Sequence, residues 1–161
     1  MSIFLRDYYG NSRLSARQIL ADPVLFLAFG FGSGLSKFMP GTMGTVAAIP
    51  LYLTLMLLNP WLYLATTVLS VVLGIAICER AAKKLDSHDF GGIVWDEVAG
   101  FLITMCWLPL TWQSLLAGFA LFRFFDIVKP WPIRWLDRHV EGGFGIMLDD
   151  VVAGIFAAIV P

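Results

Sequence analysis

Charged side chains are scarce in this sequence, and their scarcity indicates what kind of protein it is. Only 14% of the 161 residues are charged and 58% are hydrophobic, whereas soluble domains average about 25% and about 45–50%. A soluble fold of this length, enough for one domain, would lack the polar side chains to cover its surface. The composition therefore predicts a membrane protein in which residues 1–161 form a single membrane-embedded domain and the polar segment 1–22 is cytoplasmic.

Cysteine and histidine are equally sparse, with two residues of each. Cys78 and Cys106 lie in apolar runs without a CxxC spacing or a paired histidine, so we interpret them as buried hydrophobic residues. This excludes a disulfide framework and a zinc site. The N-terminus lacks the apolar stretch of a secretory signal. The net charge of -1 indicates no partner by itself; we expect no nucleic acid and leave the oligomeric state open.

Charge is absent altogether from two long stretches. No charged residue lies between Lys37 and Glu79, and 25 uncharged positions separate Glu97 from Arg123. A helix needs about 20 residues to cross a bilayer, so the first stretch holds two spans with a turn at Asn59-Pro60, where proline cannot continue the preceding helix. The whole pattern predicts an all-α, polytopic membrane helix bundle of about five spans: 43–58, 61–78, 92–110, 112–129 and 144–160.

The distribution of charge also predicts the orientation of the bundle. The two outer turns, 59–60 and about 109–112, are uncharged, so the acidic and basic motifs lie at the other end, which its lysines and arginines mark as cytoplasmic. Tryptophans near both ends fit an aromatic belt: Trp61, Trp107 and Trp112 outside, and Trp95, Trp131 and Trp135 inside. A rival topology with one span over 98–118 would place Lys129 and Arg134 outside. We prefer five spans, because the rival leaves "LPLTW" in mid-bilayer.

Acidic residues lie about one turn inside the cytoplasmic ends of three predicted helices. At about 1.5 Å of rise per residue, their depths agree to within several ångströms. Carboxylates gathered at one depth repel one another, so they need either protons or a cation. Oxygen ligands without clustered histidine or cysteine suit Mg²⁺. The predicted metal ligands are Asp96, Glu97, Asp126, Asp149 and Asp150, joined by Asp89 from the loop "KKLDSHDFGG". Two alternatives stay open: the acids serve only as helix caps or ion-pair partners, or they form the relay of an ion or proton transporter.

Two segments carry candidate phosphate ligands. "GFGSGLSKFMPGTMGT" (30–45) offers backbone N–H groups with Thr42 and Thr45 at the start of a helix, although a flexible entry loop explains it equally well. It is not a P-loop. "FRFFDIVKPWPIRW" (122–135) places Arg123 and Lys129 near the headgroup level, where both suit a phosphate. Arg123 is three residues from Asp126, so the two side chains also qualify as a simple ion pair.

Four motifs, in order, resemble the bacterial phosphatidylglycerophosphatase A family: "FGSGLSKFMPGTMGT", "IVWDEVAGF", "FRFFDIVKPWPIRWLDR" and "GGFGIMLDDVVAG". The resemblance extends from Pro23 to Ile159. It implies a multi-pass, Mg²⁺-dependent phosphatase of the bacterial inner membrane with its active site facing the cytoplasm. Such an enzyme hydrolyses the lipid phosphatidylglycerophosphate to phosphatidylglycerol and inorganic phosphate. The matching motif positions are Gly41, Thr42, Gly44, Thr45, Asp96, Glu97, Arg123, Asp126, Lys129, Asp149 and Asp150. Lys37 departs from the family pattern, which leaves its role open.

We therefore expect metal-assisted hydrolysis of a phosphomonoester, in which Arg123 and Lys129 offset charge on the phosphoryl oxygens. The expected catalytic residues are Asp96, Glu97, Asp126, Asp149 and Asp150. A covalent aspartyl-phosphate is a variant, although no DxDx(T/V) stretch favours it, and no CxxxxxR phosphatase loop is present. A CDP-alcohol phosphotransferase is the enzymatic rival, but its DGxxAR pattern is absent. Against a transporter, no acid falls near mid-bilayer.

Overall fold

The computed structural model describes residues 14–87 and 90–160, and every regular element in these ranges is a helix. The all-α prediction is therefore confirmed. In chain order the elements are α1 (Ala16–Ala21), α2 (Pro23–Ala28), the short 3-10 helix η2 (Ser33–Leu35), α3 (Pro40–Leu55), α4 (Pro60–Leu85), α5 (Trp95–Thr104), α6 (Trp112–Val128), α7 (Ile133–His139) and α8 (Gly142–Ile159).

Local sequence signals explain where the long helices begin. Pro40 and Pro60 occupy the first positions of α3 and α4, where a missing N–H costs nothing and the fixed φ suits a helix. The Asn59 side chain accepts a hydrogen bond from Trp61 N at 2.8 Å, and Thr111 accepts one from Ser114 N at 3.1 Å. These caps satisfy N–H groups that the helix itself leaves unpaired.

Helix length separates the predicted spans into two groups. Within the described ranges, α4 with 26 residues and α8 with 18 residues are long and apolar enough to cross a membrane. The 10-residue α5 is about 15 Å long, roughly half of the hydrocarbon core. It is therefore much shorter than the predicted span 92–110. The structure shows two candidate spans, and the count of five stays a prediction, as does the single domain.

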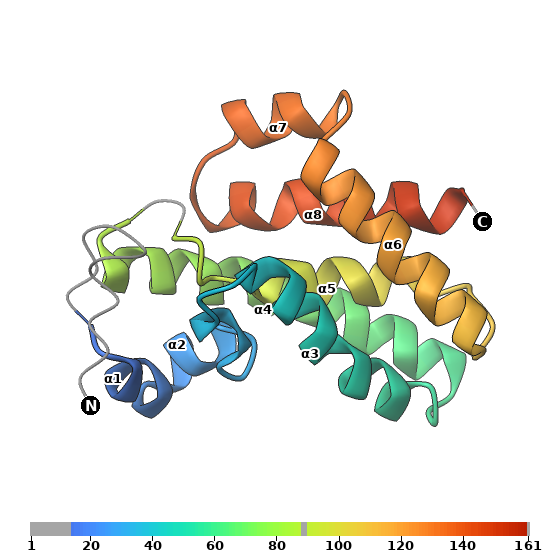
Figure 1. The fold of residues 1–161 in the computed structure, drawn as a ribbon, viewed down its shortest axis with the longest axis horizontal. Coiled ribbons are helices and arrows are strands. Elements are labelled where there is room, and N and C mark those ends of the chain that lie inside the picture. The colour runs from blue at the N-terminus through green and yellow to red at the C-terminus, as the bar shows by residue number, and fades with distance from the viewer. Residues whose placement is uncertain (1–13, 88–89, 161) are drawn as a thin grey trace.

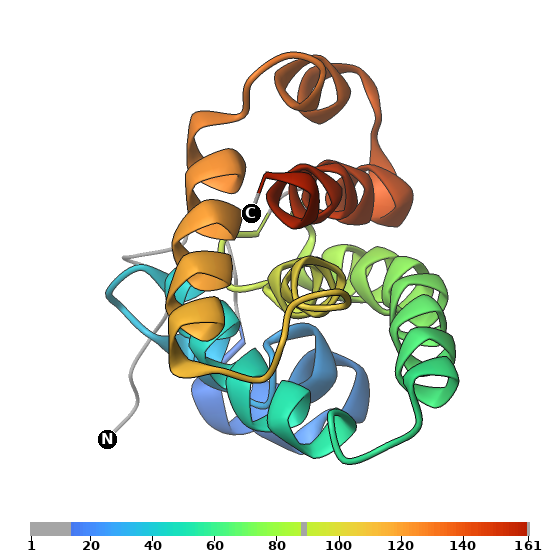
Figure 2. The same ribbon diagram turned by 90° about the vertical axis from the view of Figure 1, so that its right-hand side faces the viewer.

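The short α5 lies at the centre of the bundle. In the end-on view of Figure 2 it is surrounded by α3, α4, α6 and α8. Glycines allow the closest approach: a Cβ on Gly154 of α8 would lie 2.5 Å from the carbonyl oxygen of Gly100 on α5. Ala99 and Ala153, which precede these glycines, are fully buried. Small residues thus let α5 and α8 pack backbone against backbone, as the Ala-Gly steps of the sequence suggest.

Two of the connections between helices lie at the same end of the molecule. The α3–α4 turn, the α5–α6 turn and the C-terminal end of α8 all lie on the right of Figure 1. The beginning of α8 and the end of α4 lie toward the opposite end. We call the end with the two turns the turn end of the bundle.

The outward faces of the helices are apolar. On α4 five large aliphatic side chains are at least half exposed: Leu62, Val68, Leu69, Val72 and Leu73. A soluble protein rarely exposes such a contiguous patch, so these faces fit a lipid environment. Most tryptophans are exposed as an aromatic belt requires, but Trp95 is not, because it is 8% exposed and donates to Ser70 O at 3.1 Å. Its predicted place in the belt is wrong, since α5 is enclosed by other helices.

Candidate active site

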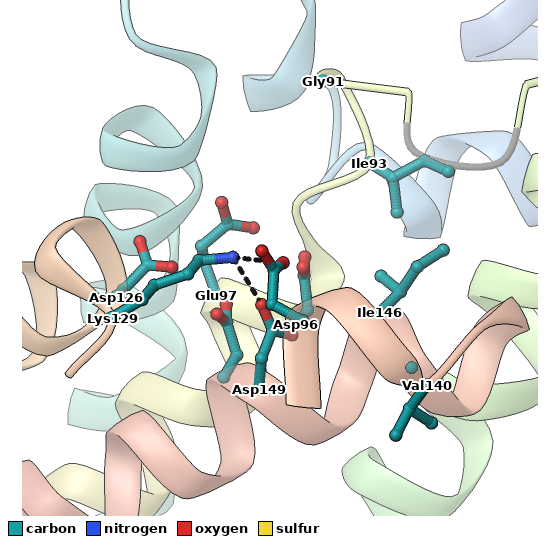
Figure 3. Close-up of a pocket in the computed structure, with 12 residues that line it drawn as sticks. Gly91, Ile93, Asp96, Glu97, Asp126, Lys129, Val140, Ile146 and Asp149 are labelled. Carbon is teal, nitrogen blue, oxygen red and sulfur yellow. Dashed lines mark hydrogen bonds and ion pairs between the residues drawn. The ribbon is translucent and has the colours of Figure 1, made fainter. Parts of the chain in front are cut away.

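A cavity of about 170 Å³ lies where α5, α6, α7 and α8 meet (Figure 3). Six carboxylates and one lysine contribute to its wall. The lining residues are Gly91, Ile93, Asp96, Glu97, Asp126, Lys129, Asp137, Val140, Gly145, Ile146, Asp149 and Asp150. All five acids that the sequence places on the three helices therefore reach one cavity.

Three of these acids form the tightest cluster. Asp96, Glu97 and Asp150 each offer a carboxylate oxygen, and these oxygens lie within 4.8 Å of one another. Asp96 and Glu97 are in the first turn of α5, whereas Asp150 is in the middle of α8. The close crossing of α5 and α8 brings them together, since the carbonyl oxygen of Asp150 itself lies 2.8 Å from where a Cβ on Gly100 would be.

Several buried carboxylate oxygens in this cavity lack a hydrogen-bond partner among the described residues. They are Asp96 Oδ1, Glu97 Oε2, Asp149 Oδ1 and Asp150 Oδ2. Buried polar atoms are nearly always paired, and unpaired buried carboxylates are costly. A hard divalent cation bound by oxygen ligands alone would satisfy those of Asp96, Glu97 and Asp150, which form the close cluster, so the residues present fit the Mg²⁺ that the sequence predicts.

Lys129 supplies the positive charge in the cavity wall. Its Nζ donates to Asp149 Oδ2 at 2.7 Å and to Asp137 Oδ1 at 2.6 Å. The residue ends α6 in a left-handed conformation with φ 46°, and Pro130 follows, which prevents the helix from continuing. The chain therefore turns at Lys129 and directs its side chain between α7 and α8.

Asp137 is a site residue that sequence reasoning missed. It lies in α7, a helix of seven residues, and the sequence around it resembles a charged loop at the membrane surface. One signal was available, because Asp137 is eight positions after Lys129 and follows a proline-directed reversal of the chain. Only the folding of α7 back onto α8 brings it to the cavity.

Arg123 lies behind the cavity wall rather than in it. It forms an ion pair with Asp126, as their spacing predicts, and its Nη1 lies 3.9 Å from Glu97 Oε1. The Arg123 side chain is 14% exposed, and its Nε has no hydrogen-bond partner among the described residues. Its geometry suits holding Glu97 and Asp126 in place; its predicted contact with phosphate stays a prediction.

The start of α3 approaches the same charged groups. A Cβ on Gly41 would lie 2.4 Å from Glu97 Oε1 and 3.2 Å from Arg123 Nη1, so only glycine fits there without displacing a carboxylate. The predicted phosphate ligands Thr42 and Thr45 do not line the cavity. Thr45 is fully buried and donates to Gly41 O at 3.0 Å. The structure thus brings Gly41, rather than the two threonines, against the charged groups.

Backbone contacts between residues 28–34 and residues 92–94 support the part of the chain that carries the acids of α5. A Cβ on Gly34 would lie 2.0 Å from Gly92 O, and Val94 N donates to Ala28 O at 2.8 Å. These backbone contacts fix the loop that leads into α5 and its two acids. Lys37 is exposed, and Asp89 lies outside the described residues.

Comparisons of the sequence with known proteins find a matching family and similar proteins. A sequence model of the family described as "Phosphatidylglycerophosphatase A" matches residues 26–161. The chain is 50% identical over 145 residues to a protein of that name from Escherichia coli (strain K12), covering 89% of this chain and 84% of the relative. It is 49% identical over 143 residues to its namesake from Haemophilus influenzae, covering 88% of both chains.

A more divergent relative carries a different name. It comes from Bacteroides thetaiotaomicron, bears a provisional name as a phosphatidylinositol-3-phosphatase, and is 41% identical over 144 residues, covering 85% of this chain and 89% of the relative. No solved structure matches the chain. The family match covers far more than half of the sequence, and two relatives near 50% identity bear the family's name. The chain therefore belongs to the phosphatidylglycerophosphatase A family.

Proposed function

We propose that this protein is a membrane-embedded phosphatase that hydrolyses phosphatidylglycerophosphate to phosphatidylglycerol and inorganic phosphate. The observation that carries the proposal is the single cavity lined by acids from α5, α6 and α8 and by Lys129. The chain belongs to a family named for this activity, and its relatives named phosphatidylglycerophosphatase A are near 50% identical.

Asp96, Glu97 and Asp150 are the residues that would hold Mg²⁺, because their oxygens are mutually within 4.8 Å. When bound, the ion would polarise a phosphoryl oxygen and lower the pKa of a coordinated water. Lys129 is held at the cavity wall by Asp137 and Asp149, so its ammonium group can offset charge that develops on phosphoryl oxygens. Arg123 keeps Glu97 and Asp126 oriented.

The membrane arrangement follows from the same framework. We propose about five membrane-embedded helices, α3, α4, α5, α6 and α8, with the turn end facing away from the cytoplasm. Exposed Trp61, Trp107 and Trp112 near that end suit a membrane interface. The charged motifs then face the cytoplasm of a bacterial inner membrane, and the acid cavity lies near the depth of lipid phosphates.

A direct assay tests the proposal. Protein purified in a neutral detergent should release inorganic phosphate from phosphatidylglycerophosphate when Mg²⁺ is present. EDTA should stop the reaction, and added Mg²⁺ should restore it. Ion flux through protein-containing liposomes without phosphate release would instead favour a transporter. Phosphate release that EDTA leaves unchanged would refute the metal site.

The Bacteroides relative suggests a second candidate substrate. Phosphatidylinositol 3-phosphate and phosphatidylglycerophosphate both carry a phosphomonoester on an alcohol that is joined to the lipid by a phosphodiester. The two lipids can be compared by kcat/KM in the same mixed micelles. We expect phosphatidylglycerophosphate to be preferred, because the 50% and 49% identical relatives are named for its hydrolysis.

A further inference from the structure

A second, more open hollow lies beside the catalytic cavity. Its volume is about 350 Å³, and it is formed by the end of α6, the turn that follows it, and α7. Its wall contains Lys129, Trp131, Arg134, Trp135, Arg138 and His139. We call it the α7 groove. Because Lys129 lines both hollows, the groove and the catalytic cavity are neighbours with one cationic side chain between them.

The charge of the α7 groove is opposite to that of the catalytic cavity. No carboxylate contributes to its lining, since Asp137, on the same helix, lines the catalytic cavity instead. Arg138 forms no ion pair within the described ranges. Arg134 uses Nη2 to donate to Val128 O at 3.1 Å, which leaves most of its five N–H donors available. Two guanidinium groups one helical turn apart therefore present unused donors, the arrangement that binds phosphate best.

Aromatic side chains place the groove at the level of lipid headgroups. Trp131 is 81% exposed and Trp135 is 51% exposed, and Trp135 stacks on His139 with ring centroids 4.7 Å apart. Exposed tryptophans beside arginines are typical of the membrane–water interface. These side chains favour a lipid phosphate as the anion that the groove binds.

We propose that the α7 groove binds the phosphodiester of the same lipid whose terminal phosphomonoester enters the catalytic cavity. This inference rests on the proposed function. The substrate carries two phosphates separated by a glycerol unit, and the chain offers two adjoining hollows that share Lys129. The monoester meets the acidic cavity, where a cation is required, and the diester meets the guanidinium groups of Arg134 and Arg138. The groove thereby selects lipids with a phosphodiester over phosphatidic acid, which has none.

Kinetics of a double variant test the assignment. In neutral detergent micelles at a fixed lipid fraction, Arg134→Gln/Arg138→Gln should raise KM for phosphatidylglycerophosphate about 10-fold or more, with a smaller change in kcat. This magnitude corresponds to the loss of hydrogen bonds to a charged group. Arg138→Gln alone, which removes no ion pair of the described chain, should raise KM several-fold.

A matched control separates the groove from general surface charge. Arg17→Gln/Arg80→Gln removes two exposed positive charges outside the groove and should leave KM unchanged. An equal rise in KM for both double variants would overturn the proposal, because it would mean that the arginines only attract anionic micelles.

A binding measurement keeps the inference independent of turnover. Short-chain phosphatidylglycerol retains the diester but lacks the terminal phosphate, so it should raise the thermal unfolding temperature of the wild-type protein more than short-chain diacylglycerol does. The groove variant should lose this difference, and equal stabilisation by both lipids would refute the assignment. Failure of the proposed function would appear separately, as an absence of phosphate release by wild-type protein that still binds phosphatidylglycerol.

Discussion

At the scale of single residues, the acids of the cavity fall into two groups. Asp126, Asp137 and Asp149 each have a close basic partner, which is Arg123 for Asp126 and Lys129 for the other two. Asp96, Glu97 and Asp150 form the close cluster of carboxylates, and Glu97 also lies 3.9 Å from Arg123 Nη1. Neutralising a member of the first group would break an ion pair, whereas neutralising a member of the second removes a candidate metal ligand. The two kinds of substitution should therefore have different kinetic effects.

We predict that Asp150→Asn lowers kcat by more than the ~10–100-fold typical of changes outside the ligand shell of a metal. The amide is neutral and a poorer Mg²⁺ ligand than the carboxylate. Phosphate release at a fixed, saturating Mg²⁺ concentration measures the effect. Asp86→Asn is the matched control, because Asp86 is exposed, lies away from the cavity and has a left-handed φ of 50°, which asparagine tolerates. Near-normal turnover by Asp150→Asn would contradict the metal cluster.

Asp22 gives a pH-dependent prediction outside the membrane-embedded helices. A hydrogen bond from Lys84 holds the pKa of the Asp22 carboxyl below its usual 3.8, so the ion pair stabilises the folded state above that pH and is lost as the pH falls through the lowered pKa. Asp22→Asn keeps Oδ1 as the acceptor for Val24 N and Leu25 N, but it removes the charge and the Oδ2 acceptor of the Lys84 hydrogen bond.

The Asp22→Asn variant should therefore unfold at a slightly lower temperature at pH 7. We expect a cost below about 1 kcal/mol, because the pair is partly exposed. Thermal unfolding at several pH values measures the gap between wild type and variant, which should close in acid below the lowered pKa. A gap that stays constant down to that pH would mean that the charge does not act through Lys84.

At the scale of helices and loops, glycines decide how closely the charged ends approach. Gly100 and Gly154 join α5 to α8, and Gly41 lets α3 begin against Glu97 and Arg123. The loop before α5 is fixed by backbone contact between Gly34 and Gly92. The positions of the acids thus depend on close contacts at these glycines, and a methyl group added to one of them would push its neighbours apart.

We predict that Gly41→Ala lowers kcat strongly, by up to about 100-fold, because displacing a catalytic group by about 1 Å can cost that much. The new Cβ must push Glu97 away from its present position. Gly118→Ala is the matched control: its Cβ would also be crowded, at 2.4 Å from Met105 Sδ, but it meets a flexible side chain away from the cavity. Activity per folded molecule should fall only for Gly41→Ala, and thermal stability is measured in parallel. An equal loss of activity in both variants would refute a local effect on Glu97.

At the scale of the whole molecule, the bundle has two chemically different ends. The turn end has exposed tryptophans near its turns, whereas the acid cavity and the α7 groove lie among the charged motifs. The exposed apolar faces between them fit the hydrocarbon of a bilayer. This division predicts which positions are accessible from each side of the membrane.

Cysteine labelling tests that division. In a background without Cys78 and Cys106, Leu57→Cys and Leu110→Cys should react with an impermeant maleimide in intact spheroplasts, because both residues are exposed at the turn end. Lys37→Cys should react only after the membrane is opened. Labelling of Arg138→Cys in intact spheroplasts, together with protection of Leu110→Cys, would instead support the rival topology with one span over 98–118.

Much of the helix pattern could be predicted from the sequence, because its signals are local. Uncharged stretches, prolines and caps locate α3, α4, α6 and α8. Most of the predicted ends of these helices lie within a few residues of the observed ends. The predicted span 92–110 is longer than α5 (Trp95–Thr104), because the contacts that delay the start of α5 until Trp95 come from distant residues. The predicted place of Trp95 in the aromatic belt is wrong for the same reason, since nothing local indicates that other helices enclose it.

Hydrophobicity, spacing and motif order are properties of the chain alone, and they suffice to predict the all-helical class, the depth of the acids along their helices and the likeness to a phosphatase family. Which acids meet depends on how the helices pack. α5 packs on α8 at the Gly100–Gly154 contact, and this packing brings Asp96, Glu97 and Asp150 together. The reversal of the chain after Lys129 brings Asp137 to the same cavity. Side chains from different helices converge only when the helices pack, and their packing depends on contacts between residues that are far apart in the sequence.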